Sequence, residues 1–106
     1  MMEQHAALAK LLSSEMAVEL SPGLSLHELR DLLGTHINRM IQANPSRLFA
    51  ILYRVDVSEQ KVREIMHGSH SDSGILIAEL VIERQLQKLA SREEYRGKTG
   101  GNEEEW

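Results

Sequence analysis

The chain contains few residues whose type and spacing are typical of catalysis or metal binding. Glu64 and His67 have the Glu-x-x-His spacing that points two metal ligands to the same side of a helix in di-metal carboxylate bundles. Those sites need the motif twice, with further glutamates on long helices, whereas this chain has it once, in a short predicted helix. Glu79 and Glu83 lie one helical turn apart and could chelate a metal, but an ion pair of Glu83 with Lys88, Arg84 or an arginine of a partner chain is the simpler explanation. We therefore predict no metal site.

A catalytic triad and a nucleotide-binding loop are also not indicated. The fragment at 96–100 contains Gly-Lys-Thr, but a phosphate-binding loop needs a glycine four residues earlier, a preceding strand and a following helix. The serines lie where helix faces or caps explain them, and none can be matched by spacing to a base and an orienting acid. An enzyme would need a pocket lined by His36, His67 or His70 with an acidic partner. We predict no catalytic residue, no cofactor and no enzymatic activity.

One segment, 57–68, resembles the turn and second helix of helix-turn-helix DNA-binding domains. Ser58 would begin the recognition helix, and Val62 and Ile65 would be its buried positions. Helix 45–55 would be the supporting helix. The side chains that the resemblance directs toward base edges and phosphates are Gln60, Lys61 and Arg63.

Two positions depart from that family's pattern. Bulky Leu52 stands where the family usually has a small residue, and Asp56 stands where the turn usually has glycine. Glu59 and Glu64 would also face the phosphates with like charge. Any capped amphipathic helix of a bundle produces the same pattern, and DNA binding needs a clear basic surface. A DNA-binding regulator is therefore the alternative rather than the first hypothesis.

Composition and charge are ordinary for a soluble protein of one domain. Of 106 residues, 42% are apolar and 26% are charged, and the formal net charge is −4. Residues 39–63 carry five basic side chains against two acidic ones, a mild excess that permits an anionic partner. There is no cysteine, which excludes disulfides and fits a reducing cytoplasm. No signal peptide or membrane-spanning run is evident, so we expect a cytoplasmic protein.

The elements that must position these residues are predicted to be helices throughout. Apolar spacing, capping and breaker residues predict a compact all-α bundle of five helices, at 3–20, 25–43, 45–55, 58–67 and 72–93. Ser25 and Glu28 form a capping-box pattern, and Asn44 before Pro45 is typical of a helix start. We expect one domain over 1–96 and a disordered acidic tail over 97–106.

Two details of these helices stay open. The short apolar run 48–53 could also be a strand, although the Asn-Pro start and the helical context favour a helix. Either Ser69, three residues before Asp72, or Asp72 alone could cap the last helix.

The apolar run 74–82 is apolar nearly all the way round a helix, so it must be covered on every side. The run 48–53 is also apolar on more than one side, and five short helices cannot easily bury both runs. This predicts a partner, most simply a second copy in a two-fold dimer. The residues expected at that interface are Phe49, Leu76, Ile77 and Leu80. A monomer that buries them all is the alternative. Glu79 inside the run should mark its exposed edge, or else meet an arginine across the interface.

The segments Leu52–Ser58 and Ile82–Lys88 resemble small helical bacterial proteins of no assigned function, over residues 25 to 96. The resemblance implies the fold class and a soluble bacterial protein, and it carries no activity or site residues. The function predicted from the sequence is a non-enzymatic helical module that self-associates or docks a protein partner. The alternative is the helix-turn-helix regulator.

Overall fold

A computed structural model describes the backbone of residues 2–68 and 72–99 and the side chains of residues 6–68 and 72–91. Within these residues there are five helices and no strand: α1 (Met2–Met16), α2 (Leu26–Ala43), α3 (Pro45–Arg54), α4 (Glu59–His67) and α5 (Ser73–Thr99). The all-α prediction is confirmed. The strand alternative for 48–53 is wrong, because the whole run is helical.

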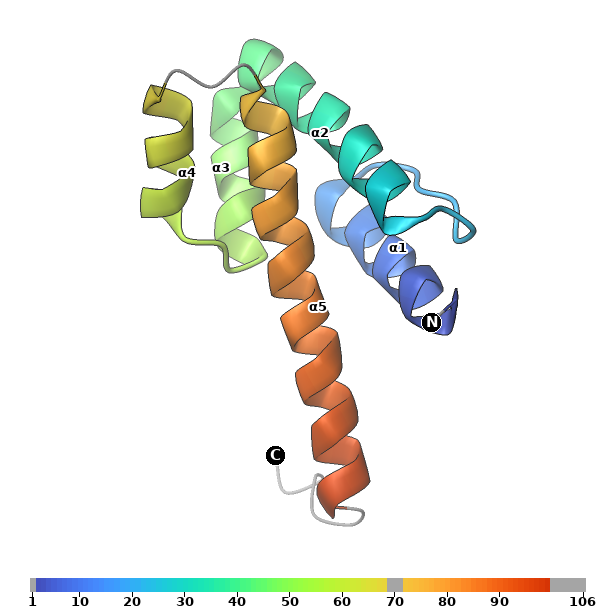
Figure 1. The fold of residues 1–106 in the computed structure, drawn as a ribbon. Coiled ribbons are helices and arrows are strands. Elements are labelled where there is room, and N and C mark those ends of the chain that lie inside the picture. The colour runs from blue at the N-terminus through green and yellow to red at the C-terminus, as the bar shows by residue number, and fades with distance from the viewer. Residues whose placement is uncertain (1, 69–71, 100–106) are drawn as a thin grey trace.

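The long helix α5 runs the length of the molecule, and the other helices pack along its first part (Figure 1). Helix α2 makes the most extensive contact with α5, while α1 and α4 contact it over shorter stretches. Helices α3 and α4 lie side by side on the other flank of α5 from α2 (Figure 1). The carboxyl-terminal part of α5 extends beyond the ends of α3 and α4.

The core is aliphatic and draws on all five helices. Most apolar positions of α1 and α2 that recur every three or four residues point inward, but Leu26 and Leu32 of α2 are exposed. The side chains fully excluded from solvent include Leu8, Leu12, Met16, Leu29, Leu33, Ile37, Leu48, Val55, Val62 and Ile77. The apolar run of α5 is largely covered within this one chain, since Ile77, Ala78, Val81 and Ile82 are all buried.

Helices α2 and α5 approach each other closely at two glycines. A Cβ added to Gly34 would lie 2.6 Å from Ile75 Cδ1 and 3.1 Å from Ile75 Cα, and Gly74 faces the Gly34 carbonyl oxygen. The Gly74 amide also donates to Asn38 Oδ1 at 2.9 Å. Only residues without a side chain allow two helix backbones to come this close.

Asp72 completes this junction by capping α5. Its Oδ1 accepts hydrogen bonds from the Ile75 amide at 3.1 Å and from Asn38 Nδ2 at 2.9 Å. The Asn38 bond, followed by the Ile75 bond, holds the pKa of the Asp72 carboxyl below its ordinary value. Asp72 therefore caps α5. Ser69, the other residue predicted to take part, lies outside the described residues.

The other predicted caps are confirmed. Ser25 Oγ accepts from the Glu28 amide at 3.1 Å while Glu28 Oε1 accepts from the Ser25 amide at 2.9 Å, a complete capping box. Asn44 caps α3 ahead of Pro45, and Ser58 caps α4. Local sequence therefore determines three of the helix starts.

The predicted end of the first helix is wrong by four residues. The helix ends at Met16, because Ala17 adopts a left-handed conformation (φ 55°) and the Val18 amide bonds back to the Ser13 carbonyl at 3.2 Å. The chain then reverses, and the Leu20 amide donates to Ser13 Oγ at 3.1 Å. Leu20 is buried as its spacing predicts, but as part of this reversal and not of the helix.

The predicted end of the last helix is also wrong. Helix α5 continues to Thr99, six residues past the predicted end, and takes Gly97 to Thr99 from the segment expected to be disordered. Glycine at position 97 does not stop it. Residues 100–106, the rest of the predicted tail, lie outside the described residues.

Candidate protein-interaction surface

The four residues predicted at an interface do not form one surface. Ile77 is fully buried by its own chain, so its assignment to an interface is wrong for this structure. Phe49 lines a groove between α3 and α4, whereas Leu80 lines a shallow depression on the far side of the 56–58 turn. Leu76 is half-buried on α5. Leu76 and Leu80 lie one turn apart on the same side of α5, whereas the neighbouring Ile77 points into the core and Phe49 belongs to α3.

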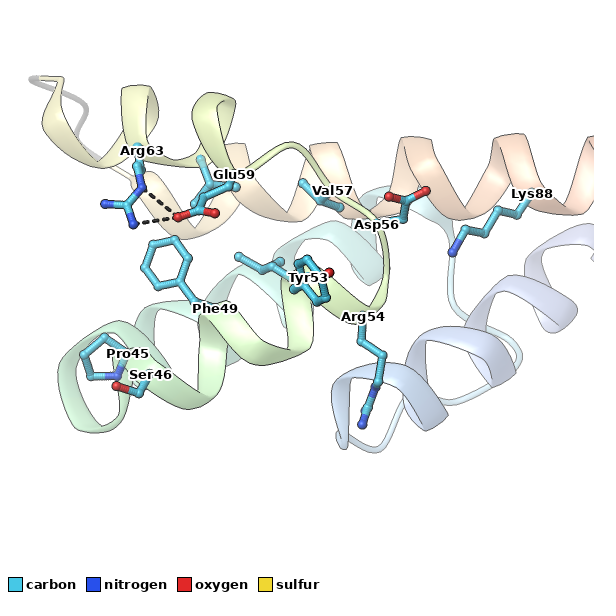
Figure 2. Close-up of a pocket in the computed structure, with 12 residues that line it drawn as sticks. Pro45, Ser46, Phe49, Tyr53, Arg54, Asp56, Val57, Glu59, Arg63 and Lys88 are labelled. Carbon is cyan, nitrogen blue, oxygen red and sulfur yellow. Dashed lines mark hydrogen bonds and ion pairs between the residues drawn. The ribbon is translucent and has the colours of Figure 1, made fainter.

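The α3–α4 groove is the more distinctive surface. The two helices run side by side in opposite directions, joined by the turn 55–58 (Figure 1). The groove lies between them (Figure 2). Figure 2 shows Phe49 and Arg63 toward one end and Asp56 and Lys88 toward the other, with Tyr53 between them. The lining residues are Pro45, Ser46, Phe49, Leu52, Tyr53, Arg54, Asp56, Val57, Glu59, Val62, Arg63 and Lys88.

The helical period of α3 explains why aromatic rings line this groove. The buried face of α3 consists of Leu48, Ile51 and Leu52, so Phe49 and Tyr53, one turn apart, share the face beside it. Phe49 is half-buried, whereas the exposed fraction of Tyr53 is 84%, the largest among the exposed large apolar residues described. Tyr53 belongs to the apolar run 48–53 but was not among the four residues predicted at an interface. Its four-residue spacing from Phe49 was the available signal.

The turn between the two helices is fixed to α5. Asp56 has a left-handed backbone (φ 70°), and the Val57 amide bonds back to the Leu52 carbonyl at 3.1 Å. Asp56 Oδ2 accepts from Arg84 Nη2 at 2.8 Å. This hydrogen bond, with the positive charge of Arg84, holds the pKa of the Asp56 carboxyl below its ordinary value.

The end of α3 is held to α5 through one carbonyl group. The Val55 carbonyl accepts from Gln85 Nε2 at 3.5 Å and from Lys88 Nζ at 3.2 Å. Gln85 is the one buried polar residue among the described side chains, and this bond satisfies it. The groove therefore has a rigid base at its turn end.

Basic side chains border the aromatic rings. The Arg63 guanidinium lies 5.3 Å from the centroid of the Phe49 ring, a cation–π arrangement, and pairs with Glu59 at 2.6 Å. Arg54 is held loosely, its Nε lying 3.9 Å from Glu15 Oε1. Tyrosine and arginine are the residue types most enriched at the centres of protein interfaces.

The residues proposed to read DNA are all exposed on α4, but their surroundings differ from a basic reading surface. Gln60 Nε2 lies 3.5 Å from Glu64 Oε2, and Arg63 is paired with Glu59. Lys61 is exposed. Helix-turn-helix domains cross their two helices at about 90–120°, whereas α3 and α4 lie alongside each other in opposite directions (Figure 2). The left-handed backbone of Asp56 does supply the conformation for which glycine is favoured in turns.

A second apolar depression lies between the start of α2 and the middle of α5. Its lining includes Leu26, Leu86 and Ala90, and the ion pair of Arg30 Nη1 with Glu79 Oε2, at 3.3 Å, lies at its edge. Glu79 thus lies on an exposed edge of α5, one of the two predicted outcomes, and its arginine partner belongs to the same chain.

The other candidate chemistry remains dispersed. No group of three or more metal-ligating side chains comes together among the residues that the structure describes. His36 Nε2 bonds to the Met16 carbonyl at 3.1 Å, His67 is exposed, and His70 lies outside the described residues. None of the described helices is long and apolar enough to cross a bilayer.

No protein-family model matches the chain, and no curated protein or solved structure matches it. The resemblance to small helical bacterial proteins therefore stays a prediction.

Proposed function

We propose that this chain is a non-enzymatic, cytoplasmic interaction module that self-associates through the α3–α4 groove. The observation that carries the proposal is the exposure of Tyr53, at 84%, beside the half-buried ring of Phe49. A large ring held on a rigid helix loses little conformational entropy on binding, which favours its use as an anchor. Covering it against a partner would remove apolar area from water.

The charges of the groove favour a second copy as the partner. The groove contains Arg63 and Lys88 as well as Asp56 and Glu59, so each sign is present on the same surface. In a two-fold dimer, the same surface of the two copies meets face to face with its direction reversed. The basic groups of one copy can then lie opposite the acidic groups of the other.

The DNA-binding alternative has less support. Glu59 and Glu64 occupy two of the positions beside the proposed reading side chains, and each accepts from one of them. A surface of balanced charge releases few counterions from DNA, and that release supplies most non-specific affinity. Titration with random duplex DNA at low salt should therefore give no salt-dependent binding that Lys61→Ala weakens.

The test is the mass of the purified protein in solution, measured by size-exclusion chromatography with light scattering over a range of concentrations. We expect the wild type to form a dimer and Tyr53→Ala to shift the equilibrium at least tenfold toward monomer. Leu32→Ala is the matched control, because Leu32 is also exposed (48%) but lies on α2 away from the groove. Circular dichroism verifies that both variants stay helical. A wild type that is monomeric throughout, or equal effects of the two variants, would contradict the proposal.

A further inference from the structure

The end of the chain beyond α5 has the chemistry to occupy one half of the α3–α4 groove. We propose that residues 100–106 dock over Tyr53 and the Lys88 end of this groove in their own chain and compete with the partner that binds there. This inference rests on the proposed use of the groove and adds a regulator to it.

The segment combines the two features that the site would recognise. It reads Gly-Gly-Asn-Glu-Glu-Glu-Trp, so three carboxylates precede the one tryptophan of the protein. Two glycines directly after Thr99 give the backbone the freedom to turn back along the helix. Trp106 offers an aromatic surface for stacking on another ring.

The Lys88 end of the groove offers complementary groups. Lys88 and Arg54 line it: Lys88 Nζ bonds to the uncharged Val55 carbonyl, and Arg54 forms one long ion pair, its Nε lying 3.9 Å from Glu15 Oε1. Asp56 lies there too, but Arg84 pairs with it at 2.8 Å. The one acidic side chain lining this end is paired with Arg84, and the glutamates of the segment would meet the positive charges of Lys88 and Arg54.

The length of the segment restricts docking to this end. Helix α5 rises about 1.5 Å per residue, so Thr99 lies about 16 Å beyond Lys88 along the helix. Seven extended residues span at most about 23–25 Å. The segment can therefore return to Lys88 and Tyr53, whereas Phe49 and Arg63 lie farther along α3 and α4 (Figure 2).

Docking in this way would cover the most exposed apolar side chain described. It would also place three negative charges where a second copy has to bind. The truncated chain 1–99 should then self-associate more strongly than the full chain, at least threefold in dissociation constant. The segment would thus limit association at low protein concentration.

The experiment uses Trp106 as the reporter, because it is the only tryptophan. We expect its fluorescence in the dilute full-length protein to be blue-shifted and protected from acrylamide quenching relative to the free peptide of residues 100–106. Tyr53→Ala and Lys88→Gln should each remove the protection, as should high salt. Lys10→Gln is the matched control, because Lys10 is exposed on α1 and has no role in the groove.

The outcomes separate this inference from the proposed function. Protection that persists on dilution and is lost in Tyr53→Ala supports docking within the chain. Fluorescence identical to that of the free peptide overturns the inference. Protection that disappears on dilution overturns docking in the same chain and assigns the segment to a second copy. Light scattering on chain 1–99 reports self-association independently, so the groove can bind a partner even where the segment does not dock.

Discussion

The α2–α5 junction and the α3–α4 hairpin are both pairs of adjacent helices, but the first pair is in close backbone contact and the second has an open groove between its helices. At the junction, Gly34 and Gly74 let two helix backbones meet directly, and Asn38 and Asp72 satisfy the polar groups that this closeness leaves. In the hairpin, the helices are separated by aromatic and charged side chains, and an open groove remains between them.

This difference indicates which pair of helices still exposes surface that a partner could cover. The apolar run of α5 suggested surplus apolar surface, but the junction buries its central residues within the chain. The exposed large apolar side chains are Leu26 and Leu32 on α2 and Tyr53 on α3. On α3, Tyr53 and Phe49 flank the buried face and line an open groove. A region packed backbone to backbone has no room for a partner, whereas a hairpin with rings at its edge has.

The largest effect should come from filling the junction. Gly34→Ala places a methyl group 3.1 Å from Ile75 Cα, a backbone atom that cannot move alone. We expect a loss of about 1–3 kcal/mol in the free energy of unfolding, measured by urea denaturation. Alanine is the better helix former by about 1 kcal/mol, so any loss means that the clash outweighs that gain.

Gly23→Ala is the control for this substitution, because a Cβ at Gly23 would meet no atom within 4 Å. It should change stability by less than about 0.5 kcal/mol. A stabilised Gly34→Ala variant would show that α2 and α5 are farther apart than described, and the contrast between the two regions would fail.

Low pH should destabilise both the α2–α5 junction and the 55–58 turn, by less than the Gly34→Ala substitution. The pKa values of Asp72 and Asp56 are lowered from 3.8 in the folded chain, so their contributions are present above that pH and are lost as the pH falls through the folded values. Amide hydrogen exchange should show faster opening at the start of α5 and at the 55–58 turn below about pH 4.

Single variants divide this acid response between the regions. In Asp72→Asn, the acid-induced increase in amide exchange should disappear at the start of α5 alone. In Asp56→Asn, it should disappear at the 55–58 turn alone. An acid response that is uniform along the chain and unchanged in both variants would contradict the assignment.

The sequence predicted the features that depend on neighbouring residues. Helix number, the capping box at Ser25, and the starts of α3 and α4 all follow from contacts within a few residues. The end of α1 did not, because Ala17 adopts a left-handed conformation that the sequence does not favour at alanine.

The candidate site was harder to predict for a physical reason. Hydrophobicity identifies residues that avoid water, but it does not say whether the same chain or another covers them. Ile77 and Phe49 look alike in sequence, yet α2–α5 packing buries Ile77 fully and leaves Phe49 at the edge of α3. The close contact of Gly34 with Ile75 joins residues 41 positions apart, which no local pattern reports.

The most direct test of the account is to map the self-association surface residue by residue. Amide chemical shifts of isotope-labelled protein would be compared between dilute and concentrated solutions by two-dimensional NMR. The account predicts concentration-dependent shifts gathered at Phe49, Tyr53 and Arg63, with little change along α2. Shifts gathered instead around Leu26 and Leu32, or no shifts at any concentration, would contradict it.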